Sequence, residues 1–158
     1  MVPYIELKRM AVELTNRFNC LLYGSLGLQL TFPQVLDEPP HDADFLTADS
    51  RSNVLRIIDF LHDNGYRVWS WKDPVVHGFD CDLLYGRLYL RASKPIIGYE
   101  PAVIDIVYEV DDFVFLLLSK QTVFVEGIRV LNKDAYIRCL GMCEKEKHLK
   151  ERQRLLSL

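Results

Sequence analysis

The sequence of 158 residues lacks a long apolar run: the longest, Phe113–Leu118, is far shorter than the ~20 residues that a membrane-spanning helix needs. It also lacks an excess of positive charge, because 19 basic residues stand against 22 acidic ones and the formal net charge is −3. That balance argues against a domain whose main task is to coat a phosphate backbone. The first nine residues carry charges and no small-residue cleavage site, so we expect no signal peptide and a cytoplasmic protein.

Cysteine is scarce, and the chain has no internal repeat, low-complexity tract or linker. The four cysteines are expected to be free thiols, because no export signal precedes them. Cys139 and Cys143 lie one helical turn apart and could supply two zinc ligands, but no compact spacing supplies two more, so core thiols are favoured. Hydrophobic residues make up 49% of the chain, enough for a core without disulfide or metal staples. We therefore predict a single domain over residues 1–158.

Hydrophobic periodicity predicts helices alternating with strands in the first half of the chain. Apolar residues at helical spacing begin at Leu7 and end at Phe18, and the run Cys20–Tyr23 is typical of a buried strand. After the small-residue turn Gly24-Ser25, a helix could start at Leu26. The later segments are then a proline-rich loop over 33–40, a strand over 41–48 and a helix that ends before Gly65.

The second half is predicted to be richer in strands. Alternation indicates strands over 66–71, 82–92, 102–110, 122–126 and 128–131, whereas 113–118 is ambiguous between helix and strand. Asn132 is placed to cap a helix. A charged helix over 144–156 would follow and bury Leu149, Leu155 and Leu156. The predicted fold class is α/β (α+β): a short mixed sheet with helices packed on one side and a C-terminal helical segment.

Three features carry chemistry. The Gly24-Ser25 turn would place backbone N–H groups at a helix N-terminus, which favours anions. Asp42 and Asp44 would lie on one face of a strand, because strand side chains repeat every two residues. Asp105 stands inside a run of β-branched residues, where burial is costly unless the carboxylate is paired or bound to a metal. Three carboxylates at one site would suit Mg²⁺, which prefers oxygen ligands.

This order of motifs resembles the DNA polymerase β-like nucleotidyltransferase superfamily. It is most similar to the small bacterial single-domain members, namely the minimal, the lincosamide-type and the AbiEii-toxin-like nucleotidyltransferases. The resemblance extends over about 20–155, including a lysine-rich stretch before Leu155. The sequence departs from the family in the long interval between Ser25 and Asp42 and in having no basic residue soon after Gly24-Ser25.

The resemblance implies a nucleotidyltransferase fold and two-metal chemistry. Asp42 and Asp44 would hold Mg²⁺ (or Mn²⁺) on a nucleoside triphosphate, ATP or GTP, and Asp105 would complete the second metal position or take the acceptor proton. Gly24 and Ser25 would donate hydrogen bonds to phosphate oxygens. A hydroxyl acceptor would attack the α-phosphate and release pyrophosphate. In this interpretation Lys147 would reach the nucleotide, although a run with this charge pattern is more often a solvated helix face.

Other interpretations stay open at this stage. A catalytically inactive module with the same fold could bind a nucleotide or a protein partner, as in a toxin–antitoxin pair. A plain interaction domain, in which the Asp42 and Asp44 pair has no role, is a third hypothesis. The acceptor is open because fold similarity does not fix substrate, and the net charge disfavours a large nucleic acid without excluding one. A homodimer that completes the acceptor cleft is also a hypothesis, and no membrane partner is expected.

Overall fold

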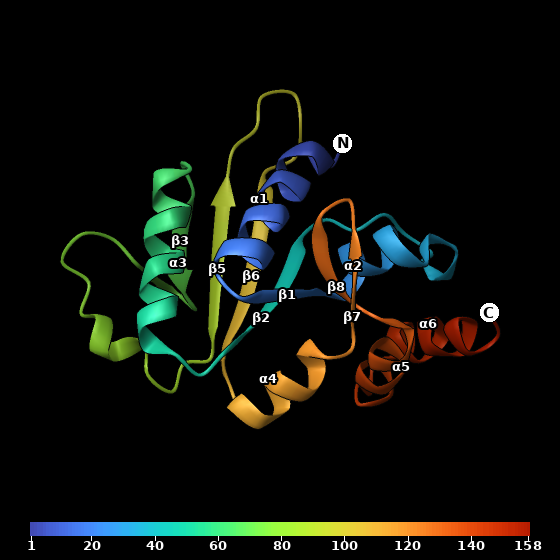
Figure 1. The fold of residues 1–158 in the computed structure, drawn as a ribbon. Helices are drawn as coiled ribbons and strands as arrows, with labels where there is room; N and C mark the ends of the chain where they lie inside the picture. Colours follow the sequence, from blue (N-terminus) through green and yellow to red (C-terminus); the bar gives the residue numbers. More distant parts are fainter.

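Eight strands form one mixed sheet in the computed structural model, which describes all residues from 1 to 158 (Figure 1). The strand order is β4-β3-β5-β6-β2-β1-β8-β7, and only the pairs β1/β8 and β2/β6 are parallel. The strands are β1 (Cys20–Tyr23), β2 (Ala43–Ala48), β3 (Arg67–Ser70), β4 (Asp73–Pro74), β5 (Tyr89–Lys94), β6 (Ala102–Val110), β7 (Thr122–Val125) and β8 (Ile128–Leu131).

Six α-helices accompany the sheet, and the mixed α/β class is confirmed. They are α1 (Tyr4–Arg17), α2 (Gly24–Thr31), α3 (Arg51–Asp63), α4 (Asp112–Ser119), α5 (Lys133–Gly141) and α6 (Glu146–Leu156), with short 3₁₀ turns over Pro33–Val35 and Cys81–Leu84. None of these helices is both long and apolar enough to cross a membrane.

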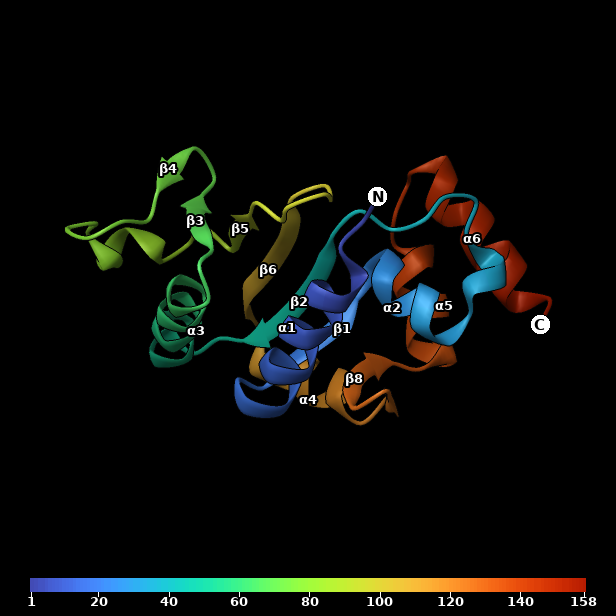
Figure 2. The same cartoon turned by 90° about the horizontal axis from the view of Figure 1, so that it is seen from above.

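The two faces of the sheet differ in the helices that cover them and in the polarity of their side chains. Helices α1 and α3 lie on the same face, and α5 and α6 stand together at the end of the molecule away from α3 (Figures 1 and 2). The side chains of one face form a buried apolar layer that includes Leu22, Phe45, Val68, Leu90, Ala92, Ile104 and Ile106. The residues in between point the opposite way and include Asp44, Asp105 and Arg91. Because apolar burial is the main driving force, α1 and α3 fix which face is left for polar groups.

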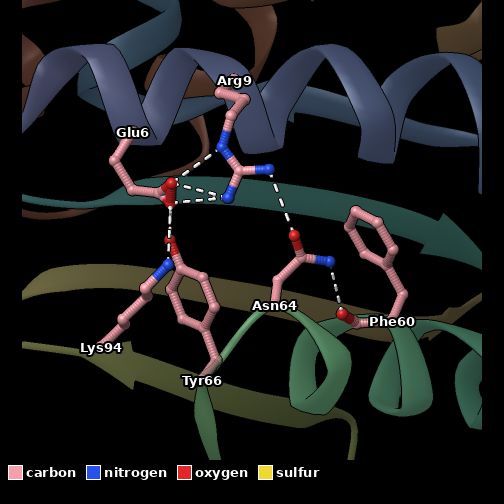
Figure 3. Close-up of polar contacts among 6 residues, drawn as sticks. All are labelled: Glu6, Arg9, Phe60, Asn64, Tyr66 and Lys94. Carbon is pink, nitrogen blue, oxygen red and sulfur yellow. Dashed lines mark hydrogen bonds and ion pairs between the residues drawn. The ribbon is translucent and has the colours of Figure 1, made fainter.

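A polar cluster joins α1 to the end of α3 and to β5 (Figure 3). The Glu6 carboxylate accepts hydrogen bonds from the Arg9 guanidinium at 2.6–2.9 Å and from the Tyr66 hydroxyl at 3.3 Å, and Lys94 Nζ lies 3.6 Å away. Arg9 also donates to Asn64 Oδ1 at 3.1 Å. Burial and the Glu6 charge raise the pKa of Tyr66. These contacts orient the two helices that cover the apolar face of the sheet.

Side-chain caps explain where two of the helices, α4 and α5, begin. The Asp111 carboxylate accepts hydrogen bonds from the backbone N–H groups of Phe113 and Val114, at 2.9 and 3.3 Å. This N-cap makes the ambiguous run over 113–118 a helix, α4. The predicted Asn132 cap is confirmed, since its side-chain oxygen accepts from the Ala135 N–H at 3.0 Å.

Two predictions about local structure are wrong. The expected strand over 82–92 begins only at Tyr89, because Asp80 caps a 3₁₀ turn through the Asp82 N–H at 3.0 Å and Gly86 adopts φ +76°. In α6 only Leu155 is buried as expected, whereas Leu149 and Leu156 are 47% and 49% exposed. The buried stripe of α6 passes through Leu155 and, one turn earlier, a glutamate at position 151.

Gly27 lies where α2 packs against Tyr136 of α5, so a substitution there measures how tight this contact is. A Cβ at this position would lie 1.9 Å from the Tyr136 hydroxyl and 3.0 Å from Val130 Cγ1. Helix propensity alone would make Gly27→Ala stabilising by roughly 1 kcal/mol. We expect the steric clash to outweigh that gain, so that urea unfolding shows Gly27→Ala to be less stable than the wild type by about 1–3 kcal/mol.

The control is a double-mutant cycle with Tyr136→Phe, which removes the hydroxyl nearest to the added Cβ. The double variant should be less destabilised than the sum of the two single variants, by about 0.5–3 kcal/mol. Strict additivity would contradict this account of the α2–α5 contact.

Candidate active site

Parallel pairing of β2 with β6 brings the three predicted carboxylates together. Asp44 and Asp105 are direct partners in the register of the two strands, and Asp42 precedes β2 by one residue. One carboxylate oxygen from each residue lies within 4.8 Å of the others. Asp105 is 5% exposed, and the other two are half-buried. The sequence analysis predicted these residues on strands. The register between β2 and β6 explains why Asp44 and Asp105 lie on the same face of the sheet.

Burial and neighbouring negative charge raise the pKa values of two of the three carboxylates. Burial, followed by the charges of Asp42 and Asp105, raises the pKa of Asp44 to about 8. Burial and the Asp105 carboxylate likewise raise the pKa of Asp42. Arg91 opposes both shifts. In the absence of a counter-ion, the site therefore favours a bound proton at Asp44 at neutral pH.

Arg91 and Tyr89, both on β5, complete the site and were not found from the sequence. Arg91 Nε and Nη2 donate to the two oxygens of Asp105 at 2.8 and 3.0 Å, and the Tyr89 hydroxyl donates to Oδ1. Burial and the bond to Asp105 raise the pKa of Tyr89 to about 12. Arg91 is the register partner of Asp105 across the antiparallel pair β5/β6. Alternating hydrophobic and polar residues predict a strand in this segment. Only the pairing register of β5 with β6 shows which of its residues faces Asp105.

Gly24 and Ser25 begin α2 directly beside Asp44. Gly24 has φ +71°, and a Cβ at this position would lie 2.4 Å from Asp44 Oδ2. The turn therefore requires glycine both for its backbone conformation and for the close approach of the carboxylate. The first N–H groups of a helix have no partner within the helix, so this terminus offers hydrogen-bond donors next to the carboxylates.

A cleft of about 440 Å³ extends from this turn toward α5 and α6. Gly24, Ser25 and Asp44 are among the residues that line it. Its wall includes Tyr136, whose hydroxyl donates to the Gly24 carbonyl at 3.1 Å. Burial, with the Asp44 charge next in size, raises the pKa of this phenol well above its ordinary value. The volume lies in the usual range of small-molecule sites, roughly 300–1,000 Å³.

The structure places Lys147 on the exposed side of α6, outside the lining of this cleft. Its charge nevertheless contributes to lowering the pKa of Asp44, against the larger effects that raise it. On the same helix, Lys150 Nζ lies 3.3 Å from the Glu146 carboxylate and forms an exposed salt bridge with it. All four cysteines are free thiols, as expected.

The donor set fits a hard divalent cation. Three carboxylates within 4.8 Å supply the oxygen ligands that Mg²⁺ and Mn²⁺ prefer, and this is the one cluster of three or more acidic, cysteine or histidine side chains in the chain with such spacing. A cation would also offset the repulsion that raises the pKa of Asp42 and Asp44. The Arg91 guanidinium, which engages both oxygens of Asp105, leaves Asp42 and Asp44 as the carboxylates without a basic partner.

Solved structures with a similar fold come from Helicobacter pylori. The structure of JHP933 aligns over 97% of this chain at 17% identity with a TM-score of 0.56. A second H. pylori structure, provisionally described as a nucleotidyltransferase, aligns over 94% at 16% identity with a TM-score of 0.54. The chain spans 64% of the length of each. It matches no protein-family model and no curated protein. At these identities the comparisons show a common fold.

Removing one carboxylate should stabilise the ion-free protein. Between the ordinary aspartate pKa of 3.8 and the folded-state value of about 8, the folded chain keeps a proton at Asp44 that the unfolded chain releases. Stability contributed by Asp44 is therefore lost as pH rises through this window. We expect Asp44→Asn to raise the melting temperature at neutral pH in the presence of EDTA, because the variant has no carboxylate to bury beside Asp42 and Asp105. The rise should be on the order of 2–4 °C for each kcal/mol of this cost relieved.

The same variant should lose the stabilisation that Mn²⁺ gives to the wild type in thermal melts. The matched control is Asp59→Asn, an exposed aspartate on α3 that takes part in none of these contacts; it should keep the wild-type response to EDTA and Mn²⁺. A lower melting temperature for Asp44→Asn in EDTA would show that the carboxylate cluster is not under repulsion.

Arg91 should compete with the cation for Asp105. Replacing it by methionine (Arg91→Met) removes a positive charge and frees Asp105 Oδ2, while Tyr89 still donates to Oδ1. Calorimetry should therefore show Mn²⁺ bound about tenfold more tightly, equivalent to roughly 1.4 kcal/mol. The ion-free variant should melt at a lower temperature, because a buried carboxylate loses its partner. Arg87→Met, whose guanidinium bonds to Asp73 at 2.7 Å instead, should leave the Mn²⁺ affinity unchanged; equal affinities for both variants would refute the competition.

Proposed function

We propose that this chain is a nucleotidyltransferase that moves a nucleoside monophosphate from a nucleoside triphosphate to a hydroxyl acceptor with the help of a divalent cation. The observation that supports this most directly is the cluster of Asp42, Asp44 and Asp105 on the sheet face opposite the apolar layer. A helix N-terminus that suits phosphate groups lies against it. The similar fold of an H. pylori structure provisionally described as a nucleotidyltransferase agrees with this proposal.

Asp42 and Asp44 would hold the cation, since neither is bound to a basic side chain. When bound, Mg²⁺ or Mn²⁺ neutralises charge on the phosphate oxygens and on the attacking and leaving oxygens. The N–H groups of Gly24 and Ser25 would bind phosphate oxygens, and Lys147 would add positive charge near the nucleotide. Asp105 would accept the proton of the acceptor hydroxyl or complete the cation site, once Arg91 has moved off one of its oxygens.

The Arg91–Asp105 pair also favours a second candidate. With both oxygens of Asp105 held by Arg91 and one also by Tyr89, the structure has a carboxylate that is already satisfied without a cation. A catalytically inactive module that binds a nucleotide or a protein partner through the same fold would need no more than this. The two candidates differ in whether the bound triphosphate is turned over.

The first test is calorimetric binding of non-hydrolysable ATP and GTP analogues, with and without Mg²⁺. We expect Mg²⁺-dependent binding to the wild type and its loss in the double variant Asp42→Asn/Asp44→Asn. With α-labelled ATP or GTP and a panel of hydroxyl acceptors, the wild type should transfer label and release pyrophosphate. Turnover in the double variant should fall by on the order of 1,000-fold, the equivalent of about 4 kcal/mol.

Asp59→Asn again serves as the control and should bind and turn over as the wild type does. Tight Mg²⁺-dependent binding without transfer to any acceptor would favour the inactive module. Failure of the folded wild type to bind either analogue would falsify the proposal and direct the search to protein partners.

A further inference from the structure

An open groove of about 680 Å³ adjoins the aspartate cluster on the side away from the cleft at Gly24. In the strand order, β5 stands beside β6, which carries Asp105, whereas β1, which leads into α2, stands beside β2, which carries Asp44. The β3–β4 hairpin accordingly lies at the opposite end of the molecule from α5 and α6 (Figure 2). The groove is lined by the hairpin and β5, through Trp71, Lys72, Asp73, Arg87, Tyr89 and Arg91.

Trp71 occupies a position that the backbone alone would give to a smaller residue. It is the first of the two residues that join β3 to β4, and its φ is +55°, where such hairpin loops favour glycine, asparagine or aspartate. The residue is 61% exposed, and its indole N–H donates to the Arg87 carbonyl at 2.8 Å. The one polar atom of the side chain is thus satisfied while the ring stays open to the groove. Strained residues of this kind cluster at ligand sites.

Tyr89 connects this exposed ring to the aspartate cluster. The ring centroids of Trp71 and Tyr89 lie 4.9 Å apart, and the Tyr89 hydroxyl donates to Asp105 Oδ1. Tyr89 and Arg91 alternate along β5, and Arg91 is the register partner of Asp105. A planar ring stacked on Trp71 would therefore lie one tyrosine side chain away from the carboxylate that is proposed to take the acceptor proton.

The groove also has a positive charge. Three of its lining side chains are cationic and one is anionic, in a chain whose net charge is −3. Lys72 is exposed and forms no salt bridge, whereas Arg87 bonds to Asp73 at 2.7 Å. An anion in the groove would give Arg91 a second partner. The proposed function needs such a partner, because Arg91 has to leave one oxygen of Asp105 before that carboxylate can act.

We propose that this groove binds the acceptor and that the acceptor is a nucleotide unit. Its base stacks on Trp71, its phosphate pairs with Lys72, and a ribose hydroxyl points to Asp105. This inference rests on the proposed function and names its acceptor. An aromatic platform with cations beside it is the combination that binds single-stranded nucleic acids. A free nucleotide and the end of a single strand both supply these groups.

The transfer step balances as follows. The ribose hydroxyl oxygen forms a bond to the α-phosphorus of the triphosphate, and the bond from that phosphorus to pyrophosphate breaks. The hydroxyl proton passes to Asp105. No oxidant, reductant or further reactant is needed.

The test is the calorimetric affinity for 5′-AMP and for a single-stranded hexamer of adenylate RNA, with the cleft at Gly24 filled by α,β-methylene-ATP and Mg²⁺. We expect Trp71→Ala to weaken binding of the preferred ligand roughly 10- to 100-fold, the range for one stacked base. Ribose 5-phosphate, which has no base, should bind the wild type and Trp71→Ala equally. Lys72→Gln should weaken the binding of both nucleotide ligands and make it less sensitive to salt.

The two nucleotide ligands distinguish the sources of the acceptor. Equal affinity for 5′-AMP and the hexamer identifies a free nucleotide, whereas tighter binding of the hexamer identifies a strand end. With α-labelled ATP in place of the methylene analogue, the wild type should transfer label to the preferred ligand. The same ligand with a 2′,3′-dideoxyribose at its end should bind and take no label.

Trp71→Phe separates stacking from a structural role. It keeps an aromatic ring but loses the N–H group that bonds to Arg87, so it should bind more tightly than Trp71→Ala. The matched controls are Phe124→Ala, a 65% exposed aromatic residue of β7 at the other edge of the sheet, and Lys120→Gln, an exposed lysine without a salt bridge. Both should bind the ligands as the wild type does.

The outcomes distinguish this inference from the proposed function. If the wild type binds no α,β-methylene-ATP, the proposed function itself fails. If the wild type binds this analogue but neither 5′-AMP nor the hexamer, the groove is not a nucleotide site and the inference is overturned. Equal binding by Trp71→Ala and the wild type would overturn it as well. So would a Trp71→Phe variant as weak as Trp71→Ala, because the indole N–H would then be the group that matters.

Discussion

The burial of three carboxylates close to one another is the constraint on which this site depends. One carboxylate oxygen from each of Asp42, Asp44 and Asp105 lies within 4.8 Å of the others. Burial, together with the neighbouring charges, raises the pKa of Asp44, so the arrangement costs folding free energy at neutral pH. Side chains on flexible loops would move apart under this repulsion. Here the register of two parallel strands in the interior of an eight-stranded sheet prevents the separation of Asp44 from Asp105.

The energy that keeps the carboxylates together comes from the other side of the sheet. The apolar layer under α1 and α3 fixes the strand register, because a one-residue slip would move every apolar side chain to the open face. Glu6 and its partners then join α1 to α3 and β5. One face of the sheet thus carries the apolar residues that stabilise the fold, and the opposite face carries the polar residues of the candidate site. Such strain at a site is typical of binding or catalytic function.

Much of this arrangement could be predicted from local sequence patterns. Periodicity located α1, β1 and β6, and the isolated Asp105 among β-branched residues indicated a carboxylate that needed a partner. Arg91 and Glu151 could not be predicted in the same way. Arg91 faces Asp105 because β5 pairs antiparallel with β6. The charge pattern of α6 is typical of a solvated helix, yet Glu151 is buried in the folded chain. Both depend on contacts between segments that are distant along the chain.

The Gly24 turn bears on how natural variation at this site should be interpreted. A larger residue at position 24 meets two independent obstacles, the positive φ and the Asp44 carboxylate 2.4 Å from a Cβ. Selection for folding alone would therefore retain glycine there, whether or not the protein binds a ligand. Ser25 follows in the first turn of α2 and has no positive φ that would restrict the residue type. Among homologues, an invariant serine at 25 would thus report on selection for activity, whereas an invariant glycine at 24 would report only on selection for the fold.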